Sequence, residues 1–484
     1  MLLARAFEKT GKNIIFITAD DKVAEDYIED FELLVGSDNS YFLPDYEVLP
    51  YEERSPHYVI RAQRIETLTR AVIKKPAIFS VSLRSFLRKI VHPDIFGKNI
   101  ITIKKNSEYN PELLVSNLIG MGYENEFQVS KIGDVARRGG IIDVFSPNTS
   151  KPVRIEFFGD EIESLRLFTI NSQCSTGEEL EEITLLPSRE FSLHNIDTTD
   201  KLWEKIHKDG FYEGIELDVF LLLPKTGTFF DYFDTDNHLI FWDEYHFFSS
   251  YIKEIFEETT DLWQKTGIKN KKRLISHPDD IFENNLYIKK ITNTTNNYFL
   301  SSSYQNFPYI IQKIESTISS QKNMHGELEI LEEELRNKLN KGYKIFIQSD
   351  NRSQSKRMRD LLPQFEEQID FTIGVFQKGF NVIDSKLAIY TDHEIFSRYK
   401  RKRRQARFSK DEALVDYDSL KPGDYIVHID HGIGIYGGLK KITITGNVIE
   451  CLTLNYADND TVYIPTYQLS LVSKYISQNG ITPV

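Results

Sequence analysis

Three groups of residues in this sequence have types and spacings that could support chemistry. A Gly-Lys pair is typical of loops that bind nucleotide phosphates, His and Asp close together are typical of metal sites, and Cys residues bind metals or form disulfides. The groups are Thr10-Gly11-Lys12-Asn13, then His428, Asp430 and His431, and finally Cys174 and Cys451.

The segment 10–13 lacks the pattern of a phosphate-binding loop. That pattern needs a Gly five residues before the Gly-Lys pair and a Ser or Thr directly after the pair, but these positions hold Ala6 and Asn13. The order of elements also differs, because a helical pattern precedes the segment and a strand pattern follows it, whereas such a loop opens a helix. We therefore predict that Gly11 ends a helix, that the chain hydrolyses no ATP, and that it holds no cofactor.

The other two groups also favour structural roles. On a strand His428 and Asp430 share one face while His431 points away, and no fourth ligand is evident, so we predict no metal site. Cys174 and Cys451 are far apart in the sequence and lack C-x-x-C spacing. This excludes a disulfide framework and fits a reducing cytoplasm, where we expect the protein to reside.

The composition excludes a general nucleic-acid binder and a membrane protein. The 484 residues include 59 basic and 72 acidic side chains, a net charge of −13, so any DNA contact must be local. The candidate is the basic run Arg398 to Arg407, with Arg401, Arg403 and Arg404, although such runs are more often solvated helical faces. No stretch approaches 18 apolar residues, and the N-terminus is no signal peptide. It begins abruptly within a helical pattern, so we expect a chain cut at both ends.

The pattern of elements predicts a multidomain fold of α/β and β type. Helical and strand patterns alternate at both ends of a β-rich segment, which indicates one α/β domain interrupted by an insertion. The predicted parts are 1–99 and 186–290 for the interrupted domain, 100–185 for the insertion, 291–395 for a small α/β domain of unknown role, 396–415 for a basic linker, and 416–484 for an all-β module.

A β hairpin is predicted in the insertion between Val153 and Phe168. A three-residue loop at 159–161, with Gly159 supplying a positive φ, places residues 158, 156 and 154 opposite 162, 164 and 166. The core face then carries Val153, Ile155, Leu165 and Leu167, and the outward face carries Arg154, Glu156, Phe158, Ile162, Ser164 and Arg166.

The composition of this outward face permits two interpretations. Arg154 opposite Arg166 is mildly repulsive, and Phe158 beside Ile162 is an apolar pair in water, whereas arginine next to an aromatic is typical of a protein interface. The alternative is that Glu156 screens both arginines and another domain covers Phe158. The residues alone leave both interpretations open.

The C-terminal module has the features of a small curved barrel. Residues 424–465 form four or five short strand patterns separated by Gly-rich bends, and a helical pattern with Leu469, Val472 and Tyr475 follows. A sheet edge with unpaired backbone groups can accept a strand from another protein.

Two motifs in the insertion carry a family resemblance. The run R-R-G-G-I-I-D-V-F-S-P (137–147), followed by V-R-I-E-F-F-G-D-E-I-E-S-L-R-L-F (153–168), resembles the inserted domain shared by UvrB and the bacterial transcription-repair coupling factor family, Mfd. The resemblance implies that this domain binds UvrA. The family's contact residues match Arg138, Arg154 and Phe158, and Arg166 lies on the same predicted face.

A third motif separates the two relatives. Residues 42–56, F-L-P-D-Y-E-V-L-P-Y-E-E-R-S-P, resemble the coupling factors closely. At this point UvrB carries an aromatic hairpin that clamps damaged DNA, and UvrB also has an intact phosphate-binding loop. Both features are missing from this sequence, so damage verification in the manner of UvrB is the least favoured function.

The C-terminal motifs V-H-I-D-H-G-I-G-I-Y-G-G-L (427–439) and L-N-Y-A-D-N-D-T-V-Y-I-P (454–465) resemble the RNA polymerase-interacting domain of the same family, which is similar to CarD. The resemblance implies a Tudor-like barrel that binds the β subunit of RNA polymerase through an exposed strand. We expect that strand within 439–444 and 449–452. The candidate contacts are Leu439, Lys440, Ile442, Ile449 and Leu452.

Taken together, the motifs resemble the N-terminal region of a coupling factor without its ATPase motor. The resemblance implies a degenerate RecA-like domain, a monomer that docks on stalled RNA polymerase and recruits UvrA, and no membrane partner. ATP, magnesium and most contact with double-stranded DNA would belong to the motor, a superfamily 2 translocase, and not to this chain. In the family the C-terminal portion masks the UvrA face. The alternative is a CarD-like transcription regulator without a repair role.

Overall fold

The computed structural model describes most of the chain between Met1 and Lys474. Outside the description lie residues 53, 171, 197–209, 219–222, 235, 270–275, 295, 303–311, 313–316, 397–421, 429–431, 445–446, 457–459, 466–471 and 475–484. Contacts divide the chain into two units, residues 1–95 with 197–403 and residues 96–196 with 404–484, and each is described by itself.

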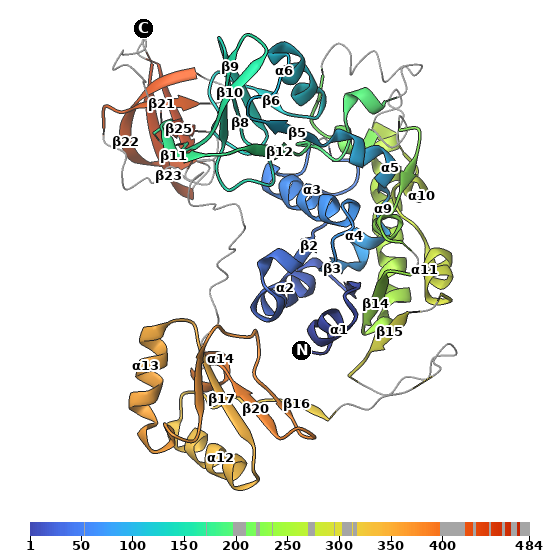
Figure 1. The fold of residues 1–484 in the computed structure, drawn as a ribbon, viewed down its shortest axis with the longest axis vertical. Coiled ribbons are helices and arrows are strands. Elements are labelled where there is room, and N and C mark those ends of the chain that lie inside the picture. The colour runs from blue at the N-terminus through green and yellow to red at the C-terminus, as the bar shows by residue number, and fades with distance from the viewer. Residues whose placement is uncertain are drawn as a thin grey trace. The chain divides into compact units, whose positions relative to one another are not determined.

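The first unit contains a five-stranded parallel sheet in the order β15-β14-β1-β3-β2 (Figure 1). Every residue of the apolar strand N-I-I-F-I-T is buried, as expected when helices cover both faces of a parallel sheet. The strands are β1 (Asn13–Thr18), β2 (Ser40–Leu43), β3 (Ile78–Ser82), β14 (His238–Asp243) and β15 (Asn297–Leu300).

Helices pack on both faces of this sheet. Leu3 of α1 (Leu2–Thr10) and Phe31 of α2 (Asp21–Val35) share a core with Phe16 and Phe241 on one face. On the other face, the ring of Trp242 contacts rings from α4 (Leu83–Leu87) and α9 (Phe248–Lys269). The remaining elements are α3 (Tyr58–Val72), β4 (Ile90–Val91), α5 (Pro93–Phe96), α8 (Ile215–Asp218), β13 (Thr226–Gly227), α10 (Pro278–Ile281) and α11 (Asn285–Thr292).

This arrangement confirms several predicted elements and corrects one boundary. The predicted α/β alternation is present, and Gly11 ends α1 in the left-handed conformation at φ 61°. However, β15 lies in the segment 291–395 that was assigned to a separate domain. Its parallel pairing with β14 makes it part of the first sheet. The predicted strand 220–224 falls mostly outside the described residues.

A buried charge cluster joins the motif 42–56 to this domain. The fully buried Arg88 donates from Nε and Nη2 to the two carboxylate oxygens of Asp45, at 2.6 and 3.1 Å. Arg64, equally buried, donates to the carbonyl of Pro44 and to Ser85. The centre of the Tyr46 ring lies 4.4 and 4.6 Å from the central guanidinium carbons of Arg64 and Arg88. The motif therefore has a structural function here, fixing the loop after β2.

Residues 96–196 form the inserted domain, whose main sheet has the order β11-β10-β9-β8-β7-β6. Its apolar face packs on α6 (Pro111–Gly120) through Leu114 and Leu118. The strands are β6 (Glu124–Asn125), β7 (Asp134–Arg138), β8 (Ile141–Val144), β9 (Val153–Phe158), β10 (Glu161–Phe168) and β11 (Ser175–Glu179), and β5 (Ile101–Lys104) pairs with β12 (Glu182–Leu185) beside them.

The β9–β10 hairpin differs from the prediction at its turn. Phe158 pairs with Glu161 and Phe157 with Ile162, so the turn has two residues and not three. A bulge between Ile162 and Ser164 absorbs one residue, and the pairs 156–164 and 154–166 are then as predicted. The consequence is that Ile162 points into the core, where it is fully buried, and is absent from the outward face.

A second α/β domain covers 318–396 with the sheet order β16-β19-β20-β17-β18. Helices α12 (Leu328–Asn340) and α13 (Arg352–Leu361) pack on one face, with Leu335 and Met358 in the core. The other elements are β16 (Ile318–Ser320), β17 (Lys344–Ser349), β18 (Asp370–Ile373), β19 (Phe380–Val382), β20 (Leu387–Tyr390) and α14 (Asp392–Phe396).

The C-terminal module is a five-stranded antiparallel sheet in the order β24-β23-β22-β21-β25. The predicted helix after residue 465 is wrong where the structure describes it, because residues 472–474 form a strand against β21. Nor are all strands short, since β22 has 13 residues. The strands are β21 (Tyr425–His428), β22 (Gly432–Ile444), β23 (Asn447–Asn455), β24 (Thr461–Pro465) and β25 (Val472–Lys474).

Within the described residues, none of the helices combines the length and the apolar composition needed to cross a bilayer.

Candidate protein-binding surfaces

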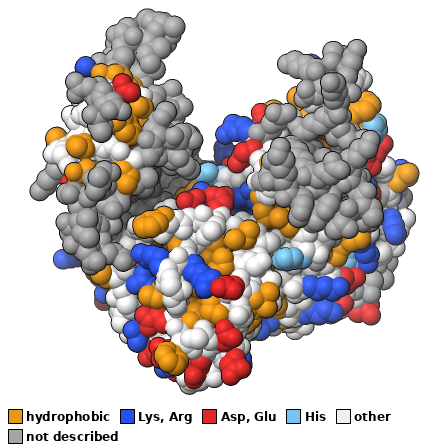
Figure 2. All heavy atoms as spheres, turned by 90° about the horizontal axis from the view of Figure 1, so that it is seen from above, with side chains coloured by type: hydrophobic (Ala, Val, Ile, Leu, Met, Phe, Trp, Pro, Cys, Tyr) orange, Lys and Arg blue, Asp and Glu red, His pale blue; other side chains and the backbone are white. Residues whose placement is uncertain are grey.

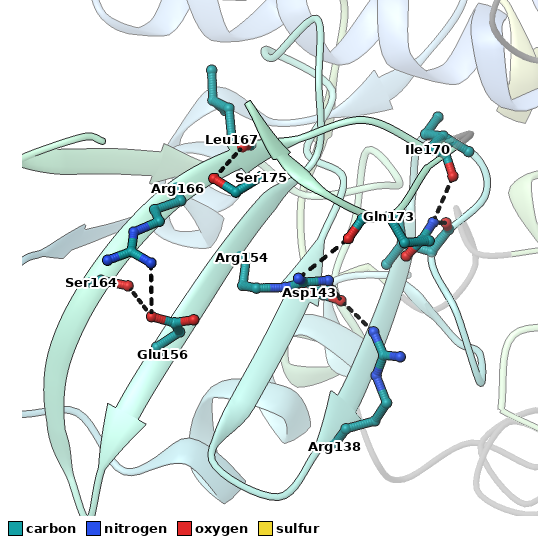
Figure 3. A network of polar contacts seen from close by, with 11 residues as sticks. Arg138, Asp143, Arg154, Glu156, Ser164, Arg166, Leu167, Ile170, Gln173 and Ser175 are labelled. Atoms are coloured by element: carbon teal, nitrogen blue, oxygen red, sulfur yellow. Dashed lines mark hydrogen bonds and ion pairs between the residues drawn. The ribbon is translucent and has the colours of Figure 1, made fainter. Parts of the chain in front are cut away.

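The polar face of the inserted sheet carries an arginine–aspartate network (Figure 3). Asp143 on β8 lies directly opposite Arg154 on β9, and its side chain is only 1% exposed. Arg154 donates from Nε and Nη2 to the two oxygens of Asp143 at 2.7 and 2.9 Å. Arg138 at the end of β7 donates from Nη2 to Oδ2 of the same carboxylate at 2.7 Å. One buried carboxylate therefore holds two of the predicted partner-binding arginines.

Arg154 is fixed on three sides. Its guanidinium carbon lies 4.8 Å from the centre of the buried Phe168 ring, and Nη1 donates to the carbonyl of Gln173 at 3.4 Å. The hydrogen bonds to Asp143 raise the pKa of Arg154 above its ordinary value. The side chain is 16% exposed, against 29% for Arg138. Arg138 is thus the more accessible of the two cations.

The carboxylate of Glu156 compensates the positive charge of Arg166, the third arginine of this face. Glu156 accepts a hydrogen bond from Ser164 and lies 3.7 Å from Nη1 of Arg166. The expectation that Glu156 screens both arginines is therefore half right, because Asp143 neutralises Arg154. Sequence reasoning missed Asp143, although the alternation in I-I-D-V places it opposite the core side chains of Ile142 and Val144.

Phe158 extends from the end of β9 and is 75% exposed. The nearby turn between β7 and β8 needs its glycines: Gly139 has φ 61°, and a Cβ on Gly140 would lie 2.8 Å from the carbonyl of Phe157. The structure thus brings Phe158, Arg138, Arg154 and Arg166 onto one domain face, with both an aromatic ring and guanidinium groups accessible.

The predicted polymerase contacts fall into three groups. Leu439 is 53% exposed on β22, and Lys440 beside it is exposed with Nζ 5.4 Å from the centre of the Tyr463 ring. Leu452 is fully buried in the core of the module, so its place among the contacts is wrong: it stabilises the sheet from inside. Ile442 and Ile449 are paired with each other in the β22–β23 ladder, and their side chains lie outside the description.

The β22–β23 hairpin extends beyond the rest of its sheet. β21 pairs with β22 only over residues 432–435, and β24 pairs with β23 only over residues 451–455. Tyr436 still exchanges backbone hydrogen bonds with Gly423 and Asp424. Among the described residues, β22 from residue 437 onward therefore has a ladder partner on one edge alone. An open edge of this kind can receive a strand from another protein.

The remaining candidates lie outside the described residues. These are the basic run with Arg401, Arg403 and Arg404, together with Asp430, His431 and the side chain of His428. In the described part of the chain, no group of three or more His, Cys, Asp or Glu side chains could hold a metal ion. Acidic and basic side chains are interspersed on the face drawn in Figure 2.

The structure shows where a phosphate would lie if the first sheet resembled a nucleotide-binding fold. This is the turn between β1 and α2, not the segment 10–13, because only the former places a helix N-terminus after a strand. Asp20 caps α2 by accepting from the amide of Val23, and Asp21 is the first helical residue. The carboxylates of Asp20 and Asp21 thus lie where a phosphate would be bound.

Asp21 makes the stability of this domain depend on pH. Burial, reinforced by the charge of Asp45, raises the pKa of Asp21 to about 6 from 3.8. An acid with a raised pKa in the folded state stabilises the fold fully below the unfolded value and loses that contribution as the pH rises through 6. We expect Asp21→Asn to raise the unfolding midpoint at pH 7.5 and to leave it nearly unchanged at pH 4, as measured by urea denaturation. An equal gain at both pH values would contradict this.

Models of two known protein families match parts of this chain. Residues 101–191 match the family model of the UvrB interaction domain, and residues 420–476 match that of the CarD-like/TRCF RID domain. The first match covers the arginine–aspartate network and the second covers the open β22 edge.

The most similar relatives include transcription-repair-coupling factors. That of Bacillus subtilis (strain 168) is 26% identical over 98% of this chain and 44% of its own length. Those of Borreliella burgdorferi (26%, covering 98% of this chain and 42% of the relative) and Staphylococcus aureus strain bovine RF122 (23%, 100% and 44%) are similar. The chain thus spans less than half the length of these relatives, to which it is similar over nearly all of its own length.

Proposed function

We propose that this chain is the docking part of a transcription-repair coupling factor, which recognises stalled RNA polymerase and recruits UvrA for nucleotide excision repair. The observation that carries the proposal is the presence of two interaction surfaces on separate domains of one chain. The inserted domain offers an exposed ring beside guanidinium groups, and the C-terminal module offers an open strand edge.

UvrA is the partner proposed for the inserted domain. The match to the UvrB interaction domain covers Arg138, Arg154, Phe158 and Arg166. Phe158, Arg138 and Arg166 are accessible to a partner. Arg154 is mostly buried and acts mainly through its contacts inside the domain. A face of this composition requires carboxylates and an apolar recess on the partner.

The β subunit of RNA polymerase is the partner proposed for the C-terminal module, with the edge of β22 adding to a strand of the polymerase. We expect Leu439→Asp to weaken this binding about tenfold, because it places a charge where an apolar side chain would be buried. Binding of the purified β subunit, measured by biolayer interferometry, tests this. Leu113→Asp is the matched control, since Leu113 is 54% exposed in the inserted domain. Equal losses in both variants would exclude a site at Leu439.

We also propose that the first domain is a degenerate RecA-like fold and that the C-terminal module is Tudor-like. Supporting the former are the parallel sheet covered by helices and the carboxylates at the start of α2, which would repel a phosphate. ATP hydrolysis, magnesium and most DNA contact are assigned to the motor of the longer relatives. We propose that the chain acts as a monomer.

A binding experiment with both partners tests the function. The chain is immobilised, and purified UvrA and RNA polymerase β subunit are passed over it separately. Binding of both supports the coupling function. Binding of the polymerase alone would favour the CarD-like regulator, which predicts no effect of a change at Arg154, and binding of neither would refute the proposal.

A further inference from the structure

Asp143 is buried in the inserted domain, but its contacts with two arginines indicate that it has a function there. Its side chain is 1% exposed, yet it accepts three hydrogen bonds, all from guanidinium groups. Figure 3 shows it between Arg138 and Arg154, with both guanidinium groups directed toward its carboxylate. A buried carboxylate on a polar sheet face, surrounded by cations, organises the residues around it.

We propose that Asp143 is the positioning residue of this surface: it fixes Arg138, directly and through the anchored Arg154, so that a guanidinium group is presented to a carboxylate of the partner protein. The inference rests on the proposed function, because the partner is UvrA. Asp143 itself contributes no contact, since its oxygens are already engaged and the side chain is inaccessible.

The strand register explains how one residue reaches both arginines. Asp143 is paired with Arg154 on one neighbouring strand and with Ala136 on the other. The small, buried Ala136 leaves space on the face of β7, and Arg138, two residues further on the same side of that strand, reaches back to Oδ2. A larger side chain at 136 would occupy this path.

The energetic benefit is preorganisation. A free arginine side chain loses rotamer entropy when it is fixed. The ion pair with Asp143 orders Arg138 before the partner arrives, so less of this cost remains at binding. Arg138 uses a single N–H group on Asp143 among the described hydrogen bonds, and its side chain is 29% exposed. The guanidinium plane therefore retains donors for a carboxylate, which it can bind in a bidentate manner.

Asp143 also prevents two cations from repelling each other. Arg154 lies directly opposite Arg166 as well as beside Asp143. Without the carboxylate, Arg154 would be a partly buried charge without its main partner, and we expect it to move from the Phe168 ring and from the carbonyl of Gln173. Loss of Asp143 thus changes the orientation of the arginine side chains on this surface, and not only its net charge.

The first test needs no partner. The whole chain is treated with phenylglyoxal, which modifies accessible arginines, and the rate at each arginine is followed by peptide mass spectrometry. We expect Asp143→Asn to raise the rate at Arg138 at least threefold. Asp134→Asn is the matched control: Asp134 is a fully buried aspartate of the same sheet whose carboxylate accepts from Ser130 and Lys131 and, among the described hydrogen bonds, from no arginine. An unchanged rate at Arg138 in Asp143→Asn would overturn the inference.

The second test separates positioning from general stability. We expect Asp143→Asn to weaken UvrA binding about tenfold in the wild-type chain and in Phe158→Ala, but less than twofold in Arg138→Gln, where the positioned group is already absent. A full tenfold loss in Arg138→Gln would overturn the inference. If the wild-type chain binds no UvrA, the proposed function fails, and the modification rates alone decide whether Asp143 positions Arg138.

Discussion

Phe158→Ala should reduce the affinity for UvrA by about 30-fold or more, corresponding to at least about 2 kcal/mol. Phe158 is 75% exposed beside accessible guanidinium groups, and a ring so placed contributes most of its contact area to a partner. Because the ring makes few contacts in the free domain, the substitution should leave the unfolding midpoint of the chain unchanged.

Titration calorimetry with purified UvrA measures this effect, and the chain supplies its own control. Phe127 is another exposed phenylalanine of the inserted domain, at 80%, and lies outside the arginine–aspartate network. Phe127→Ala should bind UvrA like the wild type. If both variants lose affinity equally, the loss comes from removing any exposed apolar ring, and the UvrA-binding surface does not lie at Phe158.

Arg88→Met should destabilise the first domain by about 3 to 5 kcal/mol, because it leaves the carboxylate of Asp45 buried without its main partner. Burial acts to raise the pKa of Asp45, but the charges of Arg88 and Arg64 outweigh it and hold this pKa below its ordinary value. The carboxylate is therefore charged at neutral pH, and removal of one cation exposes the full cost of its desolvation.

Urea denaturation followed by tryptophan fluorescence measures this effect, since Trp242 lies in the core of the same sheet. Arg84→Met is the control, because Arg84 pairs with Glu258 at the partly exposed surface and such pairs contribute less than about 1 kcal/mol. The double variant Asp45→Asn with Arg88→Met should recover part of the loss. Equal destabilisation by Arg84→Met and Arg88→Met would contradict the buried-pair argument.

The sequence determined the elements whose cause is local. The continuous apolar run N-I-I-F-I-T predicts a fully buried strand, and the glycine at position 11 predicts the helix end found there, because both depend on the chain's own periodicity and backbone freedom. The motifs 137–147, 153–168, 427–439 and 454–465 likewise sufficed to predict the two domains that the family models match.

Only the tertiary structure decided what depends on pairing between distant segments. A one-residue bulge moved Ile162 into the core while preserving the pairs around Arg154, and strand alternation cannot foresee a bulge. Leu452 is buried and Leu439 opposite it is exposed, although they are the same residue type. Asp143 acquired its place between two arginines from the register of three strands, because a carboxylate's partners are set by cross-strand distances that no local pattern encodes.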